Sequence, residues 1–183
     1  QSIVNQRELG TDTPDYLTGL QDAMRQDPDV IMLGEVRDRE VLEMMLTASE
    51  NGYLVMSCFR ANSATDAILR LLNLFPAEKH LKMQKKLANH LCGILHQRLV
   101  RGKRADRPRV PVVEVLLNNR TLRQCLLDGE WKRIARQLRE FAQEGMQDVN
   151  MSLVHLCRSE FIDPQVAMAE SPNPEELQRM LGG

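Results

Sequence analysis

A single carboxylate stands where a buried strand is predicted to end. Glu35 follows the apolar run Val30 to Leu33 and the small residue Gly34. A short continuous apolar run is typical of a strand in a parallel sheet that is covered on both faces. Ligands of open α/β sheets bind at the carboxyl ends of such strands, where an acid can hold, through water, a Mg²⁺ ion that bridges nucleotide phosphates. The pattern alone leaves an alternative, because a strand end is also a common place for a solvated carboxylate.

The elements around Glu35 are predicted to alternate between helix and strand. In chain order they are a helix that starts at Thr13-Pro14-Asp15 and stops at Pro28, the strand 30–33, a helix from the cap Asp38 to Asn51-Gly52, the strand 53–58, and a helix capped by Asn62 or Ser63 that closes before Pro76. N-cap residues, first-turn proline and helix-ending glycine give these boundaries. The order and spacing are typical of right-handed crossovers in an α/β sheet.

The pattern changes after Pro76. We expect one long helix or two over 77–99, a basic loop over 101–109, and a strand over 110–117, which Pro111 places at an edge or at its start. From residue 119 onward the pattern is helical, with prolines between short helices. We therefore predict two domains, residues 1–118 and residues 119–183.

The composition and charge of the chain exclude some classes of function. The chain has 183 residues, of which 43% are hydrophobic, and a formal net charge of -1. Near-neutral charge argues against attraction of the whole surface to nucleic acid, so no nucleic-acid partner is expected. No apolar run reaches the roughly 18 to 20 residues of a membrane span, and no secretory signal is visible, so we expect a cytoplasmic protein without a transmembrane segment.

Several longer stretches of the chain have a distinctive amino-acid sequence. They are VNQRE at 4–8, LQDAMRQDPD at 20–29, LGEVRD at 33–38, LTASENG at 46–52, ANSA at 61–64 and LFPAE at 74–78, with weaker matches at 96–99, 113–116, 122–127 and 145–147. In these stretches the chain resembles the type II/type IV secretion ATPase family and, within it, the pilus retraction motors of the PilT and PilU kind. The chain also begins at Gln1 and not at a methionine, and we interpret it as the C-terminal part of a longer protein.

The resemblance implies a fold and an activity. The fold is α/β, a partial RecA-like P-loop NTPase core with a parallel-rich sheet and flanking helices, followed by a small C-terminal helical region. The whole protein would be a hexameric ATPase that uses ATP and Mg²⁺ and works at the cytoplasmic side of the inner membrane, as a peripheral protein. There it would act on a platform protein of the pilus, in pilus retraction and twitching motility or in type II secretion.

The resemblance also assigns roles to residues. Glu35 becomes the Walker B acid, which is the catalytic residue and the water-mediated Mg²⁺ ligand. Arg37 and Arg7 become candidates for contact with phosphate or with a neighbouring subunit, by the logic of an arginine finger. The alternative is that these arginines pair on the surface with Asp38 or Glu8.

The chain departs from the family at the histidine box. Tyr53 and Arg60 stand where the family has its two histidines. Arginine is always cationic and only donates hydrogen bonds, so Arg60 could hold a γ-phosphate but could not relay a proton. The alternative is that Tyr53 is a buried strand residue and Arg60 a solvated loop residue.

The phosphate loop is also missing from the chain. No Gly-x-x-x-x-Gly-Lys-Ser/Thr segment occurs, and the acidic box that the family has before Val4 lies outside the sequence. The chain as given is therefore not expected to hydrolyse ATP. For the full-length protein two functions stay open: an active motor, or a ring subunit with impaired hydrolysis that works in a mixed ring with an active paralogue.

Two further segments have open interpretations. The basic stretch 98–109 lacks the interleaved aromatics of a single-strand binder, and it is either a solvated loop or a contact for acidic partners or anionic lipid. It is the only support for a third function, a nucleic-acid-translocating ATPase. In the helix near residue 122, Arg123 and Asp128 lie off the apolar face, and the resemblance to the retraction motors makes them candidates for mechanical output.

Overall fold

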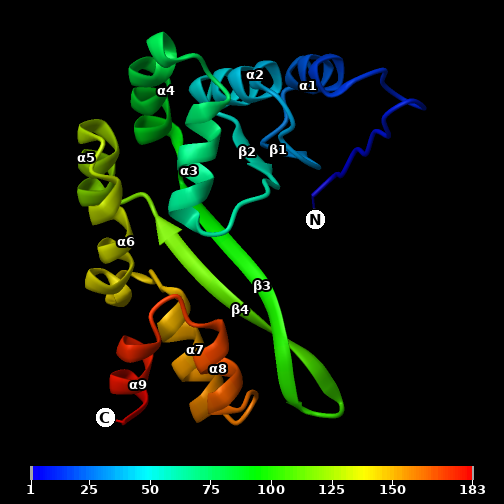
Figure 1. The fold of residues 1–183 in the computed structure, drawn as a ribbon. Coiled ribbons are helices and arrows are strands. Elements are labelled where there is room, and N and C mark those ends of the chain that lie inside the picture. The colour runs from blue at the N-terminus through cyan, green and yellow to red at the C-terminus, as the bar shows by residue number, and fades with distance from the viewer. Residues whose placement is uncertain (1, 183) are drawn as a thin grey trace. The chain divides into compact units, whose positions relative to one another are not determined.

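The chain forms two compact units in the computed structural model, which describes residues 2–182 (Figure 1). Unit 1 contains the residues up to Arg60 together with Arg70–His90, and unit 2 contains Ala61–Leu69 and the residues from Leu91 onward. The helix α3, Ala64–Asn73, begins in unit 2 and ends in unit 1. Within residues 2–182, no helix is both long enough and apolar enough to cross a bilayer.

Unit 1 is a parallel strand pair with helices packed on it. Its elements are α1 (Tyr16–Met24), β1 (Val30–Leu33), α2 (Arg39–Glu50), β2 (Leu54–Ser57) and α4 (Ala77–His90). The two strands pair in parallel from Val30 opposite Leu54 to Leu33 opposite Ser57. The predicted helix–strand alternation up to Pro76 is confirmed.

One face of the parallel pair is covered and the other is open. Ile31 and Leu33 are buried against Leu20 of α1 and against α2, and Figure 1 shows both helices on the same side of the strands. On the other face Val30 is 47% exposed and Met32 is 70% exposed. The prediction that this strand is buried on both faces is therefore wrong for the described residues, because helices pack on one face only.

Aspartate side chains cap the helices α1 and α2. Asp38 caps α2, as predicted, by accepting a hydrogen bond from Val41 N at 2.8 Å. The sequence placed the start of α1 at Thr13-Pro14-Asp15, with Thr13 as the expected cap. In the structure the cap is Asp15, which accepts a hydrogen bond from Thr18 N at 2.7 Å. A carboxylate at the positive end of a helix is favourable, and the same hydrogen bond is the main cause of a lowered pKa for Asp15.

Unit 2 is built on a long antiparallel hairpin. Its strands are β3 (Gly93–Arg104) and β4 (Arg107–Leu117), paired from Gly93 opposite Leu117 to Arg101 opposite Arg109. The predicted helix over 77–99 therefore ends at His90, and the predicted loop 101–109 consists mostly of strand. Pairing with β4 decides this segment, because it places Val100 in a buried position opposite Val110.

Helices follow the hairpin along the chain, and the last three of them share a core with it. The helices are α5 (Arg120–Asp128), α6 (Trp131–Glu140), the short 3-10 helix η1 (Ala142–Glu144), α7 (Val149–Arg158), α8 (Pro164–Glu170) and α9 (Pro174–Gly182). Val112 of the hairpin shares a core with Leu153 of α7, Ala167 of α8 and Leu177 of α9. The helical pattern expected after residue 119 is confirmed. The compact units do not follow the predicted division at residue 118, because the hairpin packs with these helices.

The end of the hairpin requires a glycine. A Cβ atom at Gly102 would overlap the carbonyl oxygen of Arg107 on the opposite strand. We expect Gly102→Ala to lower the free energy of unfolding of unit 2 by about 1–3 kcal/mol, since an overpacked site must shift backbone. Urea unfolding followed by the fluorescence of Trp131, the only tryptophan, measures this.

The matched control is Gly182→Ala, because nothing lies within 4 Å of a Cβ atom at Gly182. Its stability should stay within about 0.5 kcal/mol of the wild type. Equal stability of both variants would contradict the close approach at Gly102.

Candidate functional site

Glu35 lies at the carboxyl end of the parallel pair. β1 ends at Leu33 and β2 ends at Ser57, and parallel strands bring their carboxyl ends to one edge of the sheet. Val36 N donates to Cys58 O at 3.0 Å, which continues the pairing beyond both strands. The segments that follow β1 and β2 are thereby held side by side. The predicted position of Glu35 at this edge is confirmed.

Two arginines bind the carboxylate of Glu35. Arg60 Nε lies 3.1 Å from Oε1, and Arg37 Nε lies 3.3 Å from Oε2. The side chain of Glu35 is 27% exposed, whereas that of Arg60 is 91% exposed. Exposed ion pairs contribute little to stability, commonly about 0–1 kcal/mol, so either guanidinium can exchange Glu35 for another anion at small cost.

Tyr16 is a neighbour of the site that sequence reasoning missed. Its ring lies under the guanidinium of Arg37, with 5.8 Å between Cζ and the ring centroid. Its hydroxyl lies 3.2 Å from the position of a Cβ atom at Gly34, so a larger residue at Gly34 would crowd it. The only sequence signal was an aromatic residue at the start of α1, which does not reveal its partners.

Tyr53 and Arg60 lie at opposite ends of β2. Tyr53 comes directly before the strand, and its hydroxyl donates to Met24 O at the end of α1 at 3.2 Å. Its ring packs against the core under α1 and α2. Arg60 follows the strand and reaches Glu35. The geometry favours the alternative interpretation for Tyr53, a structural strand residue, and brings only Arg60 to the acid.

Arg7 pairs with Asp22 of α1 at 3.6 Å and not with Glu8, the partner considered in the sequence. Arg37 pairs with Glu35, while Asp38 serves as a helix cap. Arg37 therefore belongs to the site, whereas a phosphate or subunit contact for Arg7 stays a prediction.

The mechanical-output candidates lie on the exposed side of α5. Leu122, Cys125 and Leu126 are buried, as the apolar face predicted, while Arg123 and Asp128 are exposed. Asp128 accepts hydrogen bonds from Gln124 Nε2 at 3.0 and 2.9 Å. Their role stays a prediction.

Unit 2 contains a buried carboxylate that the sequence did not single out. Glu114 of β4 is 6% exposed and accepts a hydrogen bond from Ala64 N, in the first turn of α3, at 2.6 Å. It lines a hollow of about 290 Å³ with Asp148, whose carboxylate pairs with Arg139 at 2.7 Å. Burial raises the pKa of Glu114, and the hydrogen bond from Ala64 opposes that shift. The sequence did contain one indication: Glu114 lies two residues from Val112 and from Leu116, and therefore on the same, buried face of the strand.

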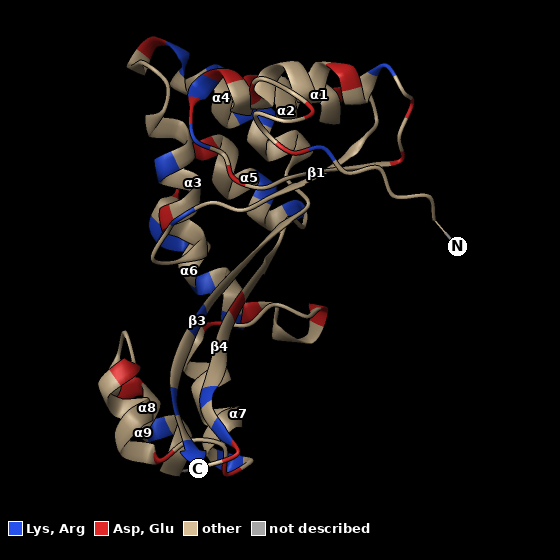
Figure 2. Ribbon diagram, turned by 90° about the vertical axis from the view of Figure 1, so that its right-hand side faces the viewer, with Lys and Arg blue, Asp and Glu red and all other residues tan. Residues whose placement is uncertain are grey.

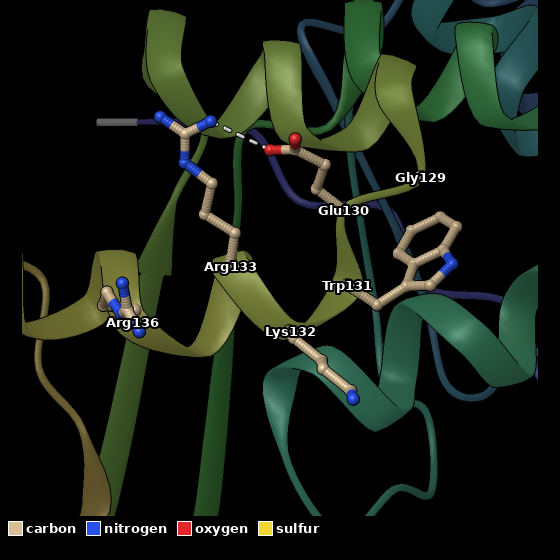
Figure 3. A pocket seen from close by; sticks show the side chains of 6 residues that line it. All are labelled: Gly129, Glu130, Trp131, Lys132, Arg133 and Arg136. Carbon is tan, nitrogen blue, oxygen red and sulfur yellow. Dashed lines mark hydrogen bonds and ion pairs between the residues drawn. The ribbon is translucent and has the colours of Figure 1, made fainter.

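A second, wide hollow of about 550 Å³ lies at the turn between α5 and α6 (Figure 3). Its lining is mainly basic, with Lys132, Arg133 and Arg136 beside Trp131, and Arg133 is paired with Glu130 at 2.9 Å. Neither hollow is at the Glu35 site.

Comparison with known proteins identifies the relatives. Residues 4–160 match the family described as Type II/IV secretion system protein. The type IV pilus ATPase PilU of Pseudomonas aeruginosa is 33% identical over 184 residues, which cover 98% of this chain and 47% of PilU. The type IV pilus retraction ATPase PilT of the same organism is 31% identical over 175 residues, covering 96% of this chain and 50% of PilT.

The solved structure of the pilus retraction motor PilT with bound ADP has the same fold, with a TM-score of 0.84 and 36% identity over 97% of this chain and 49% of that one. The predicted fold class, an α/β part of a RecA-like core, is thereby confirmed. The chain spans about half the length of the relatives that it matches.

The raised pKa of Glu114 predicts a pH dependence of stability. An acid whose pKa is higher in the folded than in the unfolded state binds more protons when folded, so its contribution is complete below the ordinary value of 4.5 and is lost as the pH rises through the folded pKa. Relative to Glu114→Gln, whose amide oxygen can still accept from Ala64, the wild type should lose stability as the pH rises from the ordinary value of 4.5 upward.

Urea unfolding of both proteins across this pH range, followed by Trp131 fluorescence, measures the difference. Glu78→Gln, which makes the same charge change at an exposed position of α4, should run parallel to the wild type. Parallel curves for Glu114→Gln as well would contradict the desolvation of Glu114.

Proposed function

Because the chain belongs to the Type II/IV secretion system protein family, we propose that it is the part of a hexameric ATPase of type IV pilus retraction or type II secretion that carries the magnesium-binding acid. The observation that carries the proposal is the position of Glu35 at the carboxyl end of the parallel pair, where α/β sheets bind ligands. The full-length protein would couple ATP binding and hydrolysis to pilus disassembly.

The residues at Glu35 fit a hydrated magnesium ion. Glu35 offers hard oxygen atoms and is exposed enough to meet water. A single carboxylate suits an ion that keeps several waters and binds through one or two carboxylates and substrate phosphates. Bound there, the ion would neutralise charge on the nucleotide phosphates.

Without a nucleotide, Arg60 binds the carboxylate of the proposed site. Its guanidinium satisfies one oxygen of Glu35, and a planar guanidinium binds phosphate oxygens at least as well as a carboxylate. A nucleotide phosphate at this edge would draw Arg60 away from Glu35 and free that oxygen for the hydrated ion. Arg60 would thus tighten nucleotide binding, yet it has no acceptor with which to move a proton.

Because Arg60 can bind phosphate but cannot accept a proton, it supports the second candidate function, a ring subunit with impaired hydrolysis. A ring subunit that binds ATP tightly and hydrolyses it slowly would serve beside an active paralogue in a mixed ring. The first candidate, an active motor in a homo-hexamer, requires a different proton acceptor. In both, the partner would be a pilus platform protein of the inner membrane, reached from the cytoplasmic side, with Arg123 and Asp128 of α5 as candidates for the mechanical output.

Glu35→Gln tests the proposed acid. In the full-length protein we expect magnesium-dependent ATP hydrolysis to fall by about 100-fold or more, because a charge that stabilises the transferring phosphoryl group is lost. Nucleotide binding and the fold should persist. Steady-state phosphate release and nucleotide affinity measure the two effects, and Glu40→Gln, on the exposed first turn of α2, is the control. Unchanged turnover of Glu35→Gln would move the role to another residue.

Arg60→His separates the two candidate functions. If Arg60 impairs hydrolysis, the full-length wild type turns over slowly, and histidine should raise turnover toward the 10²- to 10⁴-fold that a positioned proton-transfer group typically contributes. Arg60→Gln removes the cation without supplying a base, so it should not raise turnover. Tyr53 is kept, because its hydroxyl holds Met24.

Phosphate release by purified rings of the three proteins decides between the functions. Wild-type turnover of about 1 s⁻¹ or more, unchanged or lowered by Arg60→His, would reject the impaired subunit and favour the active motor.

A further inference from the structure

The far end of the β3–β4 hairpin concentrates positive charge. Five basic residues stand between positions 101 and 109: Arg101, Lys103, Arg104, Arg107 and Arg109. The one acid in this segment, Asp106, pairs with Arg104 at 3.1 Å, so the segment has a formal charge of +4. Figure 2 shows basic residues along both strands toward this end.

Two of these arginines face each other directly. Arg101 of β3 is the register partner of Arg109 of β4, and both are exposed. Directly opposite residues in an antiparallel pair have Cβ atoms about 4.5–5.5 Å apart, and like charges there are destabilising. In the described part of the chain, no carboxylate forms an ion pair with either guanidinium. An anion from outside the chain would relieve this repulsion.

Other arginines of unit 2 already have partners. Arg107 lies over the ring of Phe161, with 5.4 Å between Cζ and the centroid. Arg98 pairs with Glu170. The pair Arg101 and Arg109 is therefore distinct from the arginines that hold the hairpin against the C-terminal segments.

An exposed apolar pair adjoins the arginine pair. Leu99 is the register partner of Pro111, and both are exposed, Leu99 to 54%. Because side chains two residues apart lie on the same face of a strand, Leu99 and Pro111 share a face with Arg101 and Arg109. These four residues form what we call the hairpin patch, half apolar and half cationic.

We propose that the hairpin patch binds the surface of an anionic phospholipid membrane. The two guanidiniums contact lipid phosphates, and Leu99 and Pro111 enter the boundary between headgroups and acyl chains. A free phosphate would gain nothing from the apolar pair. A nucleic acid would lack a stacking platform, because the patch contains no aromatic residue. The proposal does not depend on ATP hydrolysis or on the role of Glu35.

Vesicle co-sedimentation of the full chain tests the proposal. The wild type should bind vesicles of mixed phosphatidylglycerol and phosphatidylcholine, and should not bind vesicles of phosphatidylcholine alone. Each basic residue near an anionic surface contributes a factor of about five to binding, so Arg101→Gln with Arg109→Gln should weaken it about thirty-fold. Binding should also weaken as salt is raised, since the Debye length shortens.

Two variants serve as comparisons. Lys82→Gln with Lys85→Gln makes the same change of charge at exposed positions of α4 and should bind within about two-fold of the wild type. Leu99→Ser keeps every cation and should weaken binding by about five-fold, because it removes the apolar contact. The double arginine variant should melt no lower than the wild type, since it removes a repulsion.

Specific outcomes would overturn the proposal. They are equal binding to phosphatidylcholine vesicles, an equal loss in the Lys82 and Lys85 variant, or no loss in the double arginine variant. Release by inorganic phosphate at constant ionic strength, with Leu99→Ser binding as tightly as the wild type, would show a plain anion site. Binding to polyglutamate as tight as binding to the vesicles would assign the patch to acidic polypeptides.

Discussion

The candidate site depends on one interaction, the parallel pairing of β1 with β2. Without it the segment after Leu33 and the segment after Ser57 would have no fixed relation, and Glu35 would not meet Arg60 across 25 residues of chain. The helices on the covered face, through Ile31 and its core neighbours, supply the burial that a two-stranded pair lacks by itself. Within residues 2–182, Val30 and Met32 on the other face are exposed, so the packing that supports Glu35 in this part of the chain comes from the covered face.

Local rules explain how much of the fold could be predicted from the sequence. The helix cap Asp38 and the strand β1 could be predicted because each depends only on residues within one helical turn or one strand. The second strand of the hairpin was predicted, as a strand over 110–117, whereas the first was not. The segment from Gly93 has leucine, glutamine and arginine, which suit a helix equally well, and its strand form depends on pairing with β4. For the same reason the contact from Glu114 to Ala64 could not be seen in advance.

The residues of the candidate site were easier to predict than their partners. Glu35 and Arg60 were identified from their positions after the two strands, together with the amino-acid sequence around them. The sequence does not show in which direction a side chain points. It therefore could not show that Arg60 binds Glu35 or that the hydroxyl of Tyr53 donates to Met24. Tyr16 was missed because its contacts lie with Gly34 and Arg37, far along the chain.

The bond from Glu114 to the first turn of α3 has a consequence for the order in which the protein is made. The acceptor lies 50 residues after the donor, so the start of α3 leaves the ribosome well before the carboxylate that will hold it. At about 5–20 residues per second, several seconds pass between the two. During that interval the turn that follows Arg60 has local hydrogen bonds, from Asp66 N to Ser63 Oγ and from Asn62 N to Asp66 Oδ2, and its anchoring to Glu114 waits for β4 to be synthesised.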